Sequence, residues 1–117
     1  MPNKVNTILK QYISEVSSLL GNRLKKVILY GSYARGDYEK NSDIDIMILT
    51  DLDEEELKEY RIKIRELACD LELENDVVIS PLIRNIKKYN ERIDIIPFYN
   101  NVQKEGVVLH GWKIHSK

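Results

Sequence analysis

Two short apolar runs, residues 27–30 and 44–49, constrain the fold of this chain more than any other feature of its sequence. Each has the length and the branched apolar side chains that are typical of a buried strand. Both lie beside longer segments in which apolar residues recur every three to four positions, which is the spacing of a helix with one buried face. This alternation of strands and helices predicts an α/β fold.

The first helical segment begins near residue 5 and ends at Gly21, because glycine is common just after a helix. A second helix is expected after Asp51 or Asp53, either of which can cap it, with Glu54 or Glu56 as the reciprocal partner. The expected buried face of this second helix consists of Leu57, Tyr60, Ile64, Leu67 and Leu71.

The second half of the chain predicts further elements. Residues 77–79 are β-branched and favour a third strand that ends at Pro81, because proline cannot donate a ladder hydrogen bond. Residues 82–96 are expected to be helical, and residues 106–109 are a candidate final strand. On the second helix, Ile62, Cys69 and Leu73 lie opposite the buried face, where they could meet a partner protein or be covered by the C-terminal segment.

The composition fits a single domain over residues 1–117, with a core at about 24–80 and a basic segment at 82–117. The chain has 117 residues and 43% apolar content, which can form one core. Residues 82–117 carry 7 Lys and Arg against 3 Asp and Glu, whereas residues 1–81 carry 11 against 16. The basic segment could attract triphosphate, RNA or an acidic partner, but a small excess is also typical of a solvated surface, so direct nucleic-acid binding is not expected.

Cysteine use and hydropathy indicate where such a chain works. The lone Cys69 cannot form an internal disulfide, which is typical of a reducing compartment. No apolar run is long enough to span a bilayer, and the N-terminal residues lack a secretion signal. We therefore expect a cytoplasmic protein with no membrane association.

The segment most informative about chemistry joins the two short runs. Gly31 and Ser32 follow the first run directly, and Asp43 and Asp45 open the second. Side chains in a strand alternate between faces, so the two carboxylates project to the same side. Their mutual repulsion favours a divalent cation between them, and magnesium prefers such oxygen ligands together with phosphate. A Gly-Ser turn lets backbone and hydroxyl donors approach that phosphate.

With Gly31-Ser32, ten further residues and then Asp43-x-Asp45, the chain resembles the DNA polymerase beta superfamily of nucleotidyltransferases. The likeness runs from Val27 to about Leu109 and is greatest to the minimal nucleotidyltransferases of prokaryotic toxin–antitoxin pairs. It implies a palm-like fold, with a small mixed β-sheet flanked by helices. It also implies two magnesium ions, a nucleoside triphosphate such as ATP as substrate, and no protein nucleophile.

The resemblance further implies a third carboxylate from a following strand. Asp76 matches that position because it opens the run 77–79, and we expect it to join Asp43 and Asp45 in metal binding and catalysis. Asp94 is the competing candidate, although it follows a predicted helix. Whether Asp76 or Asp94 completes the set stays open at this stage.

Other residues near the motif have two readings each. Arg35 could contact the triphosphate or pair with Asp37 or Glu39, and Ser42 could orient Asp43 or simply end the loop. Tyr33 and Tyr38 could stack on a base, although loop packing is the more common use of a tyrosine. His110 and His115 have no Cys or His partner at the spacing of a metal site.

Larger nucleotidyltransferases carry an added domain that holds the acceptor, and a chain of this length has little room for one. The resemblance therefore implies a partner, which is a HEPN-type RNase toxin. The chain would act as its antitoxin by transferring AMP to one tyrosine of the toxin. One alternative is an antitoxin that blocks its toxin by contact without turnover. Another is a homodimer that modifies a small molecule such as an aminoglycoside. The sequence leaves the acceptor, the nucleotide and the oligomeric state open.

Overall fold

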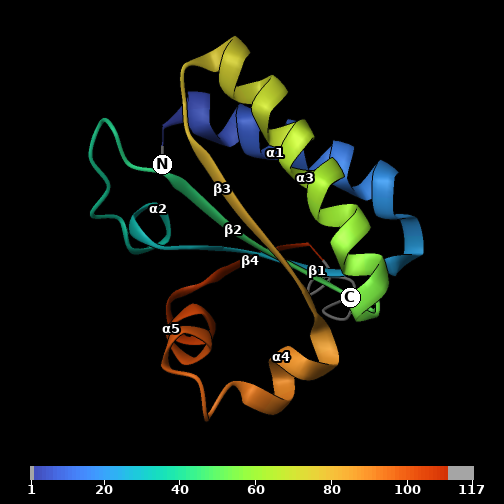
Figure 1. The fold of residues 1–117 in the computed structure, drawn as a ribbon. Helices are drawn as coiled ribbons and strands as arrows, with labels where there is room; N and C mark the ends of the chain where they lie inside the picture. The colour runs from blue at the N-terminus through green and yellow to red at the C-terminus, as the bar shows by residue number, and fades with distance from the viewer. Residues whose placement is uncertain (1, 111–117) are drawn as a thin grey trace, which may run out of the picture.

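A four-stranded β-sheet with helices on both faces forms the protein in the computed structural model, which describes residues 2–110 (Figure 1). Its elements along the chain are α1 (Asn3–Leu20), the 3-10 turn η1 (Gly21–Arg23), β1 (Leu24–Tyr30), α2 (Ser32–Arg35), β2 (Ile44–Thr50), α3 (Glu54–Asn75), β3 (Ile79–Asn85), α4 (Ile86–Arg92), α5 (Pro97–Glu105) and β4 (Val107–His110). The α/β prediction is confirmed, and His115 lies outside the described residues.

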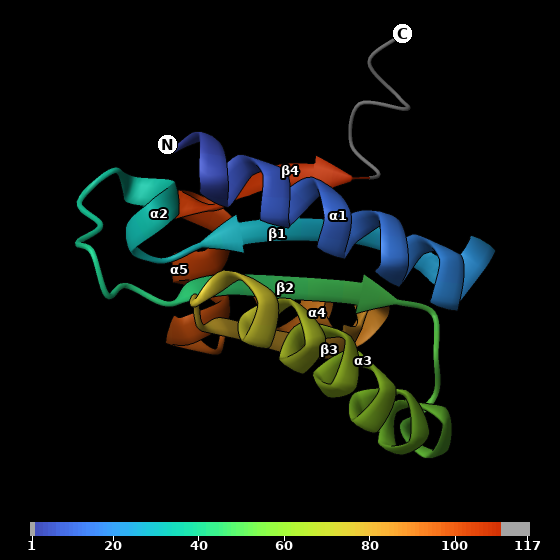
Figure 2. The same ribbon diagram turned by 90° about the horizontal axis from the view of Figure 1, so that it is seen from above.

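The sheet is mixed, as expected. Its strand order is β3-β2-β1-β4, so β3 and β4 form the two edges. β1 is antiparallel to both β2 and β4, whereas β2 and β3 are parallel. The parallel pair needs a crossover connection, and α3 supplies it. Figure 2 shows the strands side by side with α1 and α3 lying across one face.

Alternate side chains of β2 enter two separate cores. Ile44, Ile46 and Ile48 pack with α1 and α3 on one face of the sheet. Met47 and Leu49 lie in a second cluster with residues of α4 and α5 on the other face. The strand alternation therefore directs Asp43 and Asp45 to the face that α4 and α5 cover.

Both long helices follow their sequence patterns. α1 buries the predicted stripe and is followed by Gly21, which adopts a φ of 57°. At the start of α3, Asp53 accepts a hydrogen bond from the Glu56 backbone N–H, and the Glu56 side chain accepts one from the Asp53 N–H. This reciprocal cap resolves the choice between Asp51 and Asp53 in favour of Asp53.

The predicted bounds of the third strand and of the following helix were wrong. Pro81 does not end β3 but lies inside it, opposite Ile46 of β2, and the strand continues to Asn85. A proline is tolerated there because β3 is an edge strand, with no second neighbour to receive its missing N–H. The expected helix over residues 82–96 is reduced to α4, and Asp94 lies exposed in the turn before α5.

The C-terminal segment forms the predicted final strand as β4, which pairs with β1. Its described part, up to residue 110, does not cover the apolar residues on the outer side of α3, because β4 pairs with β1 at the sheet edge opposite β3. Ile62 is 66% exposed, Leu73 is 86% exposed and Cys69 is exposed. Among the described residues, no helix is both long and apolar enough to cross a membrane.

Candidate active site

The predicted carboxylate pair lies where β1 ends and β2 begins. Asp45 is paired across the sheet with Tyr30, the last residue of β1. A cavity of about 440 Å³ opens there, and its size is within the range of small-molecule sites. Its lining residues are Tyr30, Gly31, Ser32, Arg35, Ser42, Asp43, Asp45, Phe98, Asn101, Val102 and Glu105. The fold thus gathers six of the seven residues predicted for this site.

Gly31 lies directly against the Asp45 carboxylate. Its φ is +76°, a conformation that residues with a side chain rarely adopt. A Cβ atom at this position would lie 2.2 Å from Oδ2 of Asp45. The turn backbone therefore approaches the carboxylate directly. Glycine is required here for two reasons: the positive φ and the absence of space for a Cβ atom.

The carboxylate pair carries unfavourable charge. Partial burial raises the pKa of Asp45 above its ordinary value, and the adjacent negative charge of Asp43 raises it further. A divalent cation between the two groups would offset both effects. Two carboxylates plus substrate phosphates form a common magnesium site, so the residues present fit magnesium.

Arg35 and Ser42 line the cavity but also hold the loop between α2 and β2. Arg35 donates to Asp37 at 3.1 Å and lies 3.4 Å from Glu105 of α5. The Ser42 hydroxyl accepts a hydrogen bond of 2.7 Å from the Glu39 backbone N–H, which closes the loop. Of the two roles considered for Arg35, the ion pair with Asp37 is therefore observed.

The two loop tyrosines stack on each other. The Tyr33 and Tyr38 rings are 4.7 Å apart with an interplanar angle of 16°. Neither ring lines the cavity that holds the carboxylates. Tyr33 packs against the core under α1 and α3, so loop packing is their observed use.

Asp76 is the one predicted site residue that the fold does not bring to the pair. It caps the C-terminal end of α3 with a φ of 53°, three residues before β3 begins. It lines two other pockets, together with Lys40 and Val77. Within residues 2–110, no group of three or more Asp, Glu, His or Cys side chains is placed to hold a metal. β3 begins only at Ile79, so residues 77 and 78 lie outside the predicted strand, and Asp76 stays at the end of α3.

Two other positions of the β3 segment lie beside the carboxylates. The parallel register pairs Ser80 with Asp45, and the Val78 carbonyl accepts a hydrogen bond from the Ile44 N–H. The Ser80 hydroxyl lies 3.4 Å from Oδ2 of Asp43, to which it donates. Val78 precedes Ser80 by two residues and is 50% exposed, and its carbonyl bonds the residue after Asp43, so we expect its side chain on the same side as that of Ser80.

Replacing Val78 with aspartate is expected to tighten magnesium binding about tenfold, because a third carboxylate adds to the charge of the site. Calorimetric titration with Mg²⁺ measures the change. The control is Val107→Asp on β4, since that valine is 45% exposed and the substitution adds the same charge elsewhere. Equal magnesium affinity in the two variants would contradict the register of β3 beside Asp43.

The wall opposite the carboxylates was not predicted from the sequence. It comes from α5, whose residues Phe98, Asn101 and Glu105 lie along one helical face. Tyr30 meets Phe98 edge to face, with ring centroids 5.5 Å apart. Burial and then the charge of Asp45 raise the pKa of Tyr30 to about 12, so its hydroxyl stays protonated at neutral pH. The signal in the sequence was the helical spacing of residues 98, 101, 102 and 105.

A glycine-serine turn facing two strand carboxylates defines the class as one that handles nucleotide phosphates, and comparison with known proteins agrees. The chain belongs to the nucleotidyltransferase domain family, which matches residues 9–109. A Methanocaldococcus jannaschii protein, named provisionally as a protein adenylyltransferase, is 39% identical over 87% of this chain and 94% of its own length. A second protein of that organism with the same provisional name is 43% identical over 65% of this chain and 75% of its own length.

Solved structures share the fold. A crystal structure described as a toxin–antitoxin with AMP-PNP aligns with a TM-score of 0.56 and 24% identity, over 94% of this chain and 74% of that one. A nucleotidyltransferase from Sulfolobus solfataricus, so named provisionally, aligns with a TM-score of 0.52 and 23% identity, over 90% of this chain and 80% of that one. The predicted nucleotidyltransferase fold is confirmed.

Proposed function

We propose that this protein is a magnesium-dependent adenylyltransferase that transfers AMP from ATP to a tyrosine of a partner protein. The partner would be a HEPN-type toxin, which the modification neutralises in the cytoplasm. The observation that carries the proposal is the placement of Asp43 and Asp45 against the Gly31–Ser32 turn in one cavity. Phosphate donors and metal ligands then face the same space, which is what nucleotide transfer requires.

In this reaction the acceptor hydroxyl oxygen bonds to the α-phosphorus of ATP and its proton passes to solvent. The bond from the α-phosphorus to the oxygen that bridges to the β-phosphate breaks, and pyrophosphate leaves with that oxygen. Bound magnesium would be held by Asp43 and Asp45 and would neutralise the developing phosphate charge. The Gly31 backbone and the Ser32 hydroxyl would hold the phosphates in place. Rate enhancement then comes from positioning and charge, so no protein nucleophile is needed.

The α5 wall suits the nucleoside part of the substrate. Tyr30 and Phe98 give one side of the cavity aromatic surface, on which a base can stack, with a benefit of about 1–3 kcal/mol. Asn101 and Glu105 add polar groups on the same helix. The acceptor would bind near Ser80, which lies beside the two carboxylates.

Names among the relatives support a protein acceptor and a toxin partner. The two Methanocaldococcus jannaschii proteins are named provisionally as protein adenylyltransferases. Two solved neighbours are toxin–antitoxin complexes, one of them with AMP-PNP. These names describe the other proteins. Because of them, a toxin is the first acceptor that we would test.

The test incubates the protein with magnesium, labelled ATP and the product of the adjacent gene. Label in the α-phosphate should reach the partner, whereas label in the γ-phosphate should not. The Asp43→Asn, Asp45→Asn double variant should give no labelled partner. If this double variant still neutralises the toxin in cells, inhibition by contact replaces the enzymatic proposal.

A further inference from the structure

A second pocket, separate from the active site, brings together four basic residues. It lies between the start of α3, the end of β3, and helices α4 and α5, and its volume is about 220 Å³. Its lining residues are Glu54, Leu57, Arg61, Arg84, Asn85, Lys88, Tyr89, Arg92 and Tyr99. None of these residues lines the cavity of the carboxylate pair. We call it the arginine pocket.

The charge of this pocket is strongly positive. Four of its residues are cationic, and Glu54 is its one carboxylate. Glu54 is already paired with Lys88 at 2.7 Å. The hydrogen bond from Lys88 and then its charge lower the pKa of Glu54, and the charges of Arg61 and Arg92 lower it further.

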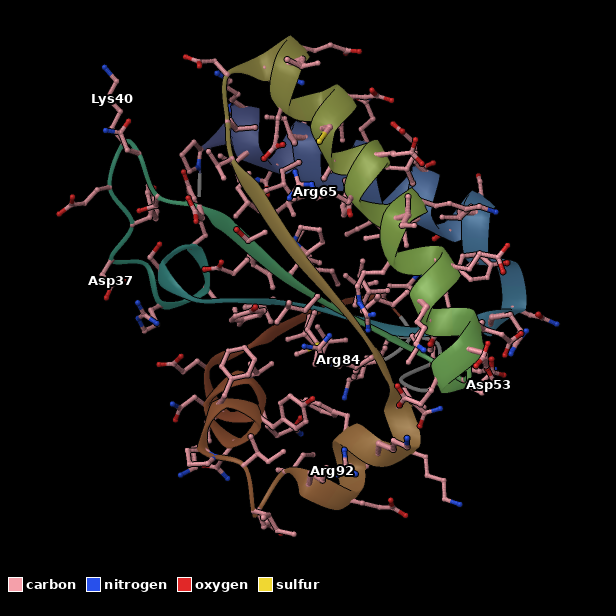
Figure 3. The ribbon with its side chains drawn as sticks, in the orientation of Figure 1. Asp37, Lys40, Asp53, Arg65, Arg84 and Arg92 are labelled. Atoms are coloured by element: carbon pink, nitrogen blue, oxygen red, sulfur yellow. The ribbon has the colours of Figure 1, made fainter. Side chains whose placement is uncertain are left out.

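Arg84 is the innermost of these cations. It is only partly exposed and lies on the face of the sheet that α4 and α5 cover, where Figure 3 shows it above Arg92 of α4. Its Nε donates to the Tyr99 hydroxyl at 3.2 Å, and its Nη1 donates to the Ile83 carbonyl at 2.9 Å. Both acceptors are neutral. Within residues 2–110, no ion pair joins Arg61, Arg84 or Arg92 to a carboxylate.

A partly buried guanidinium without a counter-charge is unfavourable, and an anion would offset that cost. Guanidinium groups bind phosphate through two parallel hydrogen bonds, which makes arginine the preferred residue for this ligand. The Tyr99 hydroxyl holds the Arg84 side chain in one orientation, which reduces the entropy lost on binding. The pocket volume suits one or two phosphate groups but is small for a whole nucleotide.

We propose that the arginine pocket binds a phosphate or pyrophosphate group through Arg61, Arg84 and Arg92. The group is either a free inorganic anion or part of a phosphate ester. This site is independent of the carboxylate pair and needs no divalent cation. Arg84 lies four residues beyond Ser80 on β3, which places it roughly 13 Å along the strand from the position beside Asp45.

The experiment titrates the full chain with inorganic pyrophosphate by calorimetry, in EDTA and at constant ionic strength. EDTA removes metal from the active site, where the carboxylates then repel anions. Arg84→Gln and Arg92→Gln should each weaken binding by about tenfold or more, which is the effect of losing a charge-assisted hydrogen bond. Lys10→Gln is the matched control, because it removes one positive charge from the exposed side of α1, outside both pockets, and should leave pyrophosphate affinity unchanged. Arg35→Gln removes a charge from the active-site cavity and shows whether pyrophosphate binds there instead.

Several results would overturn the proposal. One is that millimolar pyrophosphate does not bind. Another is that Arg35→Gln loses affinity while Arg84→Gln does not. A third is that a glutamate-rich peptide binds but pyrophosphate does not. Arg92 is exposed on α4, so its variant tests the pocket even if Arg84→Gln does not fold. A parallel titration with AMP distinguishes a free inorganic anion from a phosphate ester. If AMP binds as tightly as pyrophosphate, the natural ligand is a phosphate ester.

Discussion

Asp45→Asn should lower the rate of AMP transfer by about 10²- to 10³-fold while making the metal-free protein more stable at neutral pH. The loss of rate is expected because, in the reaction proposed above, Asp45 supplies charge that holds magnesium against the triphosphate. The gain in stability follows because the substitution removes a partly buried carboxylate that Asp43 repels. A residue that costs stability but supports catalysis is typical of an active site.

The pH dependence of this gain has a definite sign. Since the folded state raises the pKa of Asp45, the folded protein binds a proton more readily than the unfolded chain, and the ionised carboxylate is destabilising. The advantage of Asp45→Asn should therefore be full at neutral pH. It should shrink as the pH falls through the raised pKa of Asp45 toward about 3.9, the value for an unfolded chain. Urea unfolding of both proteins between pH 7 and pH 4 measures it.

Asp70→Asn provides the control for this experiment. Asp70 is exposed on α3 and does not line the cavity, and its substitution should leave the rate of transfer unchanged. If Asp45→Asn transferred AMP at the wild-type rate, the carboxylate pair would not take part in catalysis. A stability difference that does not vary with pH would show that repulsion of the Asp45 charge is not its cause.

Gly31→Ala should reduce transfer by about 100-fold or more and lower the free energy of unfolding by about 1–3 kcal/mol. Two separate effects combine at this residue. A side chain is strained at a φ of +76°, and the new Cβ would meet Oδ2 of Asp45 at 2.2 Å. The carboxylate or the turn must therefore move, which would separate the proposed metal ligand Asp45 from the proposed phosphate donors of the turn.

Gly36→Ala separates these two effects. Gly36 also has a positive φ, of 89°, but a Cβ there would meet no atom within 4 Å. The control should lose about 1 kcal/mol of stability from backbone strain alone and keep most of its activity. Thermal unfolding and labelled-ATP transfer, measured on both variants, test the distinction. Equal loss of transfer in the two variants would argue against direct contact between Gly31 and Asp45 as the cause.

Local patterns in the sequence were enough to predict much of the fold and the centre of the site. The helical spacing of apolar residues located α1 and α3, and the short runs located β1 and β2. The alternation of side chains along one strand sufficed to place Asp43 and Asp45 together. These features depend on neighbours in the chain, so they can be read before the fold is known.

The sequence by itself thus determined the Gly31–Ser32 turn, the carboxylate pair and the elements that carry them. Tertiary structure alone decided what surrounds the pair: the register of β3 set Val78 and Ser80 beside it in place of Asp76, and α5 closed the far wall. The physical reason is that strand register and helix docking arise from contacts between residues distant in the chain. Pro81 shows the same limit, because an edge strand accepts a proline that a local pattern interprets as an end.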